Sequence, residues 1–502
     1  MFEDIKHAIR KSAVYSLGNM STKLIGLILI PLYTNQKYLT VADYGALGIL
    51  EITSQVIIAV LSLAIASSFT RWFWDADYIK KQKSIFFTTL VVLTGVSLLA
   101  LSATIPVSEG ISRLIFGETS YAYVIVLVLI TSVIQILILQ IQTLQKLQSK
   151  ALMYSLVNIV KLTISLLLTI YFIVYRGKKL DGIYEAQLIG SVITLLVLIP
   201  FTIRNCVARF ETRILLEMLK FSYPLMLASI SGVLFTVIDR YALNYIEGLD
   251  KVGVYNLGYK IASALKIIVV ASVQLALSPI LMKKINDPDN RRFYSKVMTY
   301  TGFVLMFCVI GLSLFSLEAI KVAAKDQIYW ESANLVAILS FSFFFGMMKD
   351  NAIIGLHVVK KTKITGSLIV LASLINLGLN VLLIPRFSIY GASVATLISQ
   401  ILFFIMVYRS SQRLYPIPYE MRKLIQVVLA GTALIVAGFF VNPMNLGIRL
   451  VIKSLLLFSF PFILIPLRFY DRVELETIRK IFRNWKSISR LQSNLKRFFL
   501  RK

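Results

Sequence analysis

The stretch Lys11–Tyr33, KSAVYSLGNMSTKLIGLILIPLY, indicates the fold class of the whole chain. It is long and apolar enough to cross a bilayer as one helix, yet Lys23 stands near its centre. At a rise of ~1.5 Å per residue, the ammonium lies roughly 15 Å from either end of that helix. A charge at this depth costs ~2.5–3.5 kcal/mol on translocon-insertion scales. Tyr15, Asn19 and Lys23 recur at four-residue steps, so they form a polar stripe that faces a wet cavity or other helices.

Apolar runs of similar length recur along the rest of the chain. Of its 502 residues 57% are apolar, and the runs are too long and too continuous for strands. We therefore predict an all-α integral membrane protein with fourteen transmembrane helices. Lys and Arg are about four times as frequent in the loops of one side as in those of the other, which predicts that both termini are cytoplasmic. The net charge of +28 follows this loop pattern, so it indicates topology and not nucleic-acid binding.

An internal repeat divides the predicted helices into two pseudo-symmetric lobes. The segment LTVADYGALG at 39–48 returns as LDKVGVYNLG at 249–258, with an offset of 208 to 210 residues. Six helices per lobe make this a parallel repeat, which places the substrate between the lobes. The expected division is an N-lobe over 1–208, a C-lobe over 209–412, two extra helices over 413–467 and a tail over 468–502. The tail pattern predicts a basic amphipathic helix on the inner leaflet, with RNA binding as the alternative.

The chain lacks the residues of an enzyme. It contains no GxxxxGK[ST] phosphate loop, and its two histidines, His7 and His357, lie in the N-terminal tail and at an inner helix end. Acidic residues are not clustered as metal ligands. We therefore assign no catalytic residue, metal or cofactor, and the predicted class is a secondary transporter.

Basic residues inside predicted spans indicate the sign of the cargo. Deep cations outnumber deep acids, so the cavity is expected to attract anions. Lys and Arg suit phosphate oxygens, and a pyrophosphate-linked lipid fits this pattern better than an organic cation. The residues assigned to the pyrophosphate are Lys23, Lys161, Arg240, Lys266 and Lys349.

Several of these cations have a structural alternative. Lys266 is close enough to a helix end to snorkel to the headgroups. For Arg240 the alternative is an ion pair with a carboxylate from a neighbouring helix, and for Lys349 it is an ion pair with the adjacent Asp350. For Lys260 and Lys453, snorkelling is the favoured interpretation.

Uncharged and acidic residues complete the predicted cavity. Those expected to line it and to meet the glycan are Tyr15, Asn19, Asn158, Asn376 and Asn380. For Asn376 and Asn380, hydrogen bonding between helices is the favoured alternative. The residues considered for proton or cation coupling are Asp239, Asp350 and Glu51.

Three segments resemble the bacterial polysaccharide-repeat flippase family. They are LTVADYGALGILE at 39–51, VIDRYALNYIEGLDKVGVYNLGYKIA at 237–262 and NLGLNVLLIPRFSIYGASVATLIS at 376–399. The resemblance covers roughly residues 1–410, and within it Arg240 occupies the "DR" motif and Lys23 a position that is often basic. Lys161 and Lys349 match no motif of the family.

The resemblance implies the polysaccharide branch of the multidrug/oligosaccharidyl-lipid/polysaccharide exporter superfamily. The implied fold has two six-helix lobes in a V with alternating access. The implied cargo is an undecaprenyl-pyrophosphate-linked oligosaccharide, flipped to the outer leaflet of the bacterial inner membrane for O-antigen, capsule or exopolysaccharide. Expected partners are this substrate, membrane lipids and a glycan polymerase or glycosyltransferase. A multidrug or small-molecule antiporter, a polytopic glycan polymerase and a scaffolding protein are the alternatives.

Overall fold

The computed structural model describes residues 26–471 and 474–476, and its regular structure there is helical. The principal helices are α2 (Ile30–Tyr33), α3 (Val41–Leu61), α4 (Ile65–Phe73), α5 (Gln82–Thr104), α6 (Ser108–Phe116), α7 (Ala122–Leu147), α8 (Ala151–Ile170), α9 (Leu180–Asn205), α10 (Thr212–Glu247), α11 (Leu249–Ala264), α12 (Ala271–Lys283), α13 (Asn290–Leu314), α14 (Ser316–Ala323), α15 (Ser332–Ala352), α16 (Ile354–Val358), α17 (Thr362–Leu414), α18 (Met421–Val441) and α19 (Leu446–Ile463).

Twelve helices of the described part are long and apolar enough to cross a membrane. One of them, α17, runs over 53 residues and changes direction at Ser388, whose φ of 50° and ψ of −131° are not helical. It therefore contains two of the predicted spans. The first predicted span lies mostly before residue 26, outside the described residues. An all-α membrane fold is thus confirmed, and the described helices are compatible with fourteen spans.

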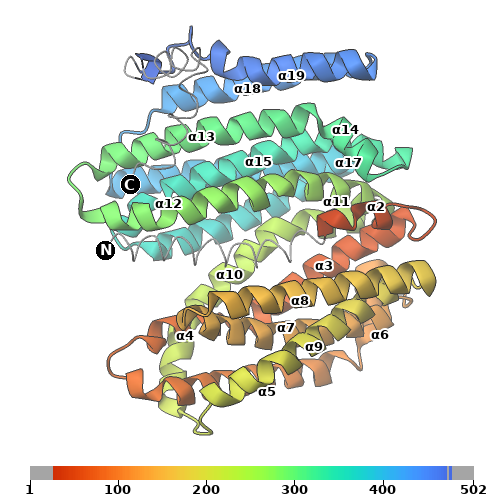
Figure 1. The fold of residues 1–502 in the computed structure, drawn as a ribbon, viewed down its shortest axis with the longest axis vertical. Coiled ribbons are helices and arrows are strands. Elements are labelled where there is room, and N and C mark those ends of the chain that lie inside the picture. The colour runs from red at the N-terminus through yellow and green to blue at the C-terminus, as the bar shows by residue number, and fades with distance from the viewer. Residues whose placement is uncertain (1–25, 472–473, 477–502) are drawn as a thin grey trace, which may run out of the picture.

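The helices pack into two bundles (Figure 1). In the first, which we call the N-bundle, α7 packs on α3, α5 and α9, and α8 packs on α9. In the second, the C-bundle, α15 packs on α11, α13 and α17. The last two helices are added on the far side of the C-bundle, where α18 packs on α13 and α19 packs on α18.

Helix α10 belongs to both bundles. Near its start, Ile214 and Met218 are buried with Phe69 and Phe86 of the N-bundle. Further along, Phe235 and other α10 side chains join the C-bundle core, and α10 packs along α17. Pro224 lies inside this 36-residue helix between the two parts.

The bundles meet where the two copies of the sequence repeat lie. Helix α3 begins with a capping box, in which Thr40 and Asp43 bond each other's backbone amides at 2.9 and 3.1 Å. Its first turns cross the first turns of α11 at Gly45 and Gly253, close enough that backbone meets backbone. Small residues permit this approach because no side chain stands between the helices.

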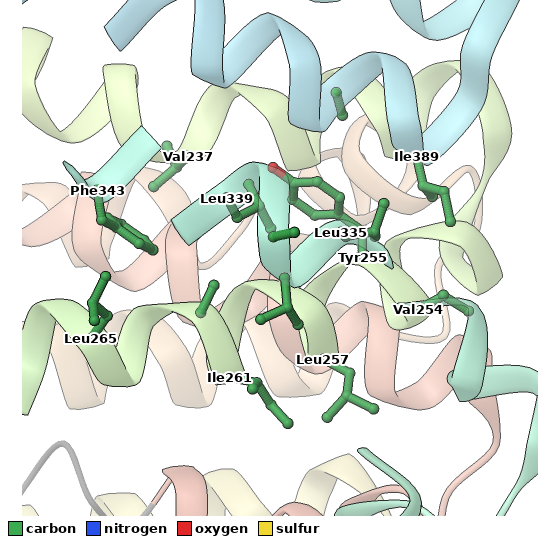
Figure 2. Packing of buried hydrophobic residues seen from close by; sticks show 14 of the residues in the cluster. Val237, Val254, Tyr255, Leu257, Ile261, Leu265, Leu335, Leu339, Phe343 and Ile389 are labelled. Atoms are coloured by element: carbon green, nitrogen blue, oxygen red, sulfur yellow. The ribbon is translucent and has the colours of Figure 1, made fainter. Parts of the chain in front are cut away.

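The hydrophobic core of the C-bundle lies next to this crossing. Figure 2 shows Tyr255 of α11 beside Leu335 and Leu339 of α15, with Ile389 of α17 close by. All four side chains are almost fully buried. This packing fixes the positions of α10, α11, α15 and α17, the four helices around the candidate site.

Candidate functional site

A cavity of about 180 Å³ lies inside the C-bundle, between α10, the end of α11, α15 and α17. Its polar lining comprises Thr236, Tyr259, Lys266, Ser342, Lys349, Asp350, Thr396 and Gln400. Two cations assigned from the sequence, Lys266 and Lys349, therefore lie on one cavity together with the predicted coupling residue Asp350. The lining carries two positive charges and one negative charge, so it favours an anion.

Lys349 is not a free cation. Its Nζ lies 2.6 Å from Oδ1 of Asp350 and 5.0 Å from the centre of the Phe403 ring. The other carboxylate oxygen of Asp350 accepts a hydrogen bond from Gln274 at 2.8 Å. The carboxylate alternative for Lys349 is thus present, and its partner is the adjacent residue in the chain.

Lys266 has a different setting. It stands in a π-helical segment, Leu265–Val270, that joins α11 to α12, and such segments are frequent at functional sites. Its side-chain ammonium forms no ion pair or hydrogen bond with a residue in the described part of the chain. Lys266 is therefore the cavity cation that is available to a ligand.

Arg240 and Asp239 lie behind the cavity wall. Both are buried, with exposed fractions of 4% and 2%. Arg240 places its guanidinium 3.7 Å from the centre of the Tyr259 ring and donates to the Thr236 carbonyl at 3.2 Å, and both of those residues line the cavity. Its Nε has no hydrogen-bond partner among residues 26–471. A buried guanidinium with an unused donor therefore lies directly behind two residues of the cavity lining.

Asp239 is held by its own partners. Tyr255 donates to its Oδ2 at 2.5 Å, and Thr396 lies 3.5 Å from the same oxygen. Its Oδ1 lies 4.0 Å from Arg240 and accepts the Arg240 backbone amide. The carboxylate beside Arg240 is therefore that of the preceding residue, and not the carboxylate from a neighbouring helix that the structural alternative expected.

Glu51 lies at the contact between the bundles and not on this cavity. Its Oε1 is 2.9 Å from Nζ of Lys260, so the pair joins α3 to α11. Beside it, the hydroxyls of Thr53 and Tyr241 are 2.7 Å apart and join α3 to α10. The snorkelling interpretation of Lys260 is wrong, because its side chain is only 13% exposed and is paired across the bundles.

The snorkelling interpretation of Lys453 is also wrong. Its side chain is 1% exposed, and its Nζ lies 2.9 and 3.0 Å from the two carboxylate oxygens of Glu318. Arg449 approaches the same carboxylate at 2.7 Å. Glu318 comes from α14, more than a hundred residues away in sequence. The residues that precede and follow Lys453 in the sequence therefore do not indicate this partner.

Lys161 and Asn158 are placed apart from the C-bundle cavity. Both lie on α8, which packs on α7 and α9. Asn158 is buried and accepts a hydrogen bond from Gln142 of α7 at 3.1 Å, so it joins two helices of the N-bundle. Lys161 is half-buried and has no ion pair within the described segments. It remains an unpaired cation within a membrane helix, and it does not line the C-bundle cavity.

Asn376 connects the two halves of α17, and Asn380 supports it from the same half. Both are fully buried; Asn376 donates to Ser399 at 3.1 Å and accepts from Asn380 at 3.1 Å. The expectation that they line the cavity is wrong. The favoured alternative, hydrogen bonding between helices, describes Asn376, whereas Asn380 donates to Asn376 within the same half of α17. Tyr15, Asn19 and Lys23 lie outside the described residues, as does the predicted tail helix beyond residue 476.

Sequence reasoning missed Tyr259, Gln274 and Gln400 at this site. Thr396 and Gln400 stand four residues apart and therefore share a face of α17, which is a signal that the sequence offered. Tyr259 and Gln274 lie on either side of the π-helical segment, where ordinary helical spacing no longer predicts which residues share a face.

The architecture defines a class before any comparison is made: a multi-span helical membrane protein of two bundles with a cationic cavity in one of them. Solved structures of other membrane proteins share the fold. The chain is similar to the lipid II flippase MurJ in its inward closed conformation, with a TM-score of 0.71, 15% identity and coverage of 89% of this chain and 98% of that one. It is also similar to an inward-facing multidrug resistance MATE family transporter of the MOP superfamily, with a TM-score of 0.66, 13% identity and coverage of 80% and 94%.

Residues 8–284 match the model of the polysaccharide biosynthesis protein family, and the chain belongs to that family. Among curated relatives, it is 28% identical over 219 residues to the capsular polysaccharide biosynthesis protein CapF of Staphylococcus aureus. It is 21% identical over 255 residues to the uncharacterized membrane protein MJ1068 of Methanocaldococcus jannaschii. These matches cover 42% and 50% of this chain, which spans about half the length of both relatives, 52% and 50%.

Proposed function

We propose that this protein is a flippase that moves an undecaprenyl-pyrophosphate-linked oligosaccharide from the inner to the outer leaflet of a bacterial inner membrane. The product would serve O-antigen, capsule or exopolysaccharide synthesis, and both termini would be cytoplasmic. The observation that carries the proposal is the meeting of Lys266 and Lys349 on one cavity inside a bundle of membrane helices. The family of polysaccharide biosynthesis proteins supports the class of cargo.

The size of the cavity limits what it would hold. At about 180 Å³ it is smaller than the ~300–1,000 Å³ of ordinary small-molecule sites. It therefore suits a pyrophosphate and not a whole glycan, which would lie outside it. Lys266 would meet phosphate oxygens directly, Lys349 would exchange Asp350 for the phosphate, and Arg240 would act through its field.

Lys23 and Lys161 extend this proposal to the N-lobe. Each would meet the pyrophosphate at a different stage of an alternating-access cycle, when the bundles have moved relative to one another. Asp239, Asp350 and Glu51 are the acids proposed for ion coupling, since each is held by a partner that a bound cation or proton would displace. A glycosyltransferase and a glycan polymerase are the proposed partners before and after the flip.

The test is a transport assay on Lys266→Gln, Lys349→Gln and the double variant. We expect the double variant to export surface glycan at least about tenfold more slowly, because two charge-assisted contacts to phosphate are lost. Lys251→Gln is the matched control, since that lysine lies on the surface at the start of α11, 3.8 Å from Glu331. Normal export by the double variant, at an equal amount in the membrane, would exclude the cavity from the phosphate path.

A second candidate function is a multidrug or small-molecule antiporter of the same superfamily. The fold shared with a MATE family transporter and the buried Asp239 beside the cavity favour it. A deletion strain separates the two functions. Loss of surface glycan with unchanged drug sensitivity supports the flippase, and drug sensitivity with normal glycan supports the antiporter.

A further inference from the structure

An open groove of about 490 Å³ runs along the outside of the N-bundle, between α5 and the end of α9. On α5 it is lined by one face from Phe87 to Leu98. At the end of α9 it is lined by Thr202 and Ile203, together with Cys206 just after the helix. We call it the α5 groove. Its floor includes Gly95, where an added Cβ would meet nothing within 4 Å. It is nearly all apolar, and it opens toward the region that lipid occupies around membrane helices.

The internal repeat explains why the groove is open. An offset of 208 relates Thr94 to Gly302 and Leu98 to Met306 on α13. That face of α13 is covered by α18, since a Cβ on Gly302 would lie 2.8 Å from Leu424, and one on Gly431 would lie 2.6 Å from Met306.

The N-bundle has a helix in the corresponding chain position, but that helix takes another course. Helix α10 comes directly after α9 in the chain, just as α18 comes directly after the second half of α17. However, α10 packs on α4 at its start and then crosses to the C-bundle. None of the described helices therefore covers the α5 groove in the way that α18 covers the corresponding face of α13.

The length of the groove indicates an acyl chain. From Phe87 to Leu98 the helix rises about 16 Å, at ~1.5 Å per residue, which is roughly half of a ~30 Å hydrocarbon core. A transmembrane helix would need a face that runs the whole thickness, as α18 has on α13. A lipid chain from one leaflet needs only half of it.

The charges at one end of the groove indicate an anionic headgroup. Lys83, one turn before Phe87, donates from Nζ to the Arg204 carbonyl at 3.0 Å, so the two basic residues stand together. The nearby Glu211 is already engaged, at 3.2 Å by Lys81 and at 3.1 Å by Arg209. Lys83 and Arg204 are exposed and form no ion pair with residues in the described ranges, so both remain available to a phosphate.

We propose that the α5 groove binds an anionic phospholipid, with its acyl chain along α5 and its phosphate at Lys83 and Arg204. The lipid belongs to the leaflet beside the 204–211 loop, the side that the Lys and Arg pattern predicts as cytoplasmic. In Figure 1, α5 and α9 lie at the end of the molecule opposite α13 and α18. The C-bundle cavity is lined by α10, α11, α15 and α17, and no residue of α5 or α9 is among its lining. The site is therefore separate from the candidate cargo site and does not depend on the proposed function.

Native mass spectrometry of the detergent-purified full chain tests this assignment, with phosphatidylglycerol and phosphatidylcholine as probes. We expect retention of phosphatidylglycerol in preference to phosphatidylcholine. We expect Lys83→Gln/Arg204→Gln to weaken that retention about tenfold, because each cation near the membrane surface adds to the affinity for an anionic lipid. Lys360→Gln/Lys361→Gln, which removes two exposed lysines from the loop before α17, is the matched control.

A second pair of variants tests the groove itself. Gly95→Trp fills it and is expected to reduce phosphatidylglycerol retention by a similar factor. Gly378→Trp adds the same bulk at another exposed helix glycine with no neighbour within 4 Å, and it is expected to change nothing.

Three results would overturn the proposal. They are equal retention by the two charge variants, equal retention by the two tryptophan variants, and a photo-cross-linker at Thr94 that captures a polypeptide in place of phospholipid. A cross-link to phospholipid supports it.

Discussion

Gly45 of α3 and Gly253 of α11 face each other across the contact between the two bundles. A Cβ on Gly45 would lie 2.0 Å from the Leu249 carbonyl oxygen, and one on Gly253 would lie 2.5 Å from the Val41 carbonyl oxygen. The partners are related by the same offset of 208 residues as the glycines themselves. The contact is thus reciprocal, like the self-complementary interface of a two-fold dimer.

The first prediction concerns this contact. Gly45→Ala is expected to destabilise the present arrangement of the bundles by about 1–3 kcal/mol, because the methyl group meets backbone, which cannot move aside alone. An apparent Tm measured in detergent reports the effect. Gly95→Ala is the control, since its Cβ meets nothing and alanine favours helix. An unchanged Tm for Gly45→Ala would show that the bundles do not touch there.

The ion pair between Glu51 and Lys260 gives the second prediction. Glu51→Gln and Lys260→Gln are each expected to lower the apparent Tm, because each leaves a half-buried charge without its partner. A double-mutant cycle should give a coupling of about 0.5–3 kcal/mol. Additive effects would mean that the two residues do not interact in the membrane.

A third prediction concerns the buried ion-pair cluster of Glu318 on α14 with Arg449 and Lys453 on α19. Glu318→Gln is expected to cost about 3–5 kcal/mol, because it leaves Lys453 and Arg449 both buried without a carboxylate. Lys453→Met is expected to cost less, since Arg449 still holds Glu318 at 2.7 Å. The two apparent Tm values test this order, and the reverse order would contradict the ion-pair assignment.

The fourth prediction concerns pH. Hydrogen bonds from Lys296 at 2.7 Å and from Lys423 at 2.8 Å lower the pKa of Asp471 to about 2. A carboxyl with a lowered pKa stabilises the fold above its ordinary pKa of ~3.9 and loses that contribution as the pH falls toward the folded value. Burial opposes it, but hydrogen bonds from Lys296, Thr299 and Lys423 together hold the pKa of Glu420 below its usual value, so Glu420 acts in the same direction.

Thermal unfolding measured between pH 5 and about 2 checks this linkage. Asp471→Asn should flatten the loss of stability on acidification, because the group that takes up the proton is gone. Asp77→Asn, at an exposed acid in the loop after α4, is the control and should leave the profile unchanged. Identical profiles for the wild type and Asp471→Asn would contradict the role of Asp471.

The fifth prediction separates charge from ion pairing at the candidate site. Lys349→Gln/Asp350→Asn removes a pair and keeps the net charge of the cavity. If Lys349 serves only to neutralise Asp350, this variant should transport normally while Lys349→Gln alone does not. If Lys349 binds the phosphate, both variants should lose transport, as measured by surface glycan at equal expression.

The sequence predicted the helical membrane fold well because long apolar runs leave the backbone no other way to satisfy its hydrogen bonds in lipid. The repeat at Gly45 and Gly253 was also visible from the sequence, although its reciprocal contact was not. Lys260 and Lys453 were misread because a helix sequence shows depth but not the residue that a distant helix brings to it. For Asn376 the sequence left two interpretations open, because a buried amide that joins helices has the same spacing as an amide that lines a cavity. The structure supports the favoured one, hydrogen bonding between helices.

Helix α10 connects the two bundles, so any movement of one bundle relative to the other acts on this helix. It is anchored by Ile214 and Met218 at one end and by Phe235 at the other, with Pro224 between them. Proline removes one backbone hydrogen bond from a helix, so bending is easiest there. The two bundles are consequently joined by one shared helix that bends most easily at Pro224. Any change in their mutual tilt would therefore bend α10 at that proline.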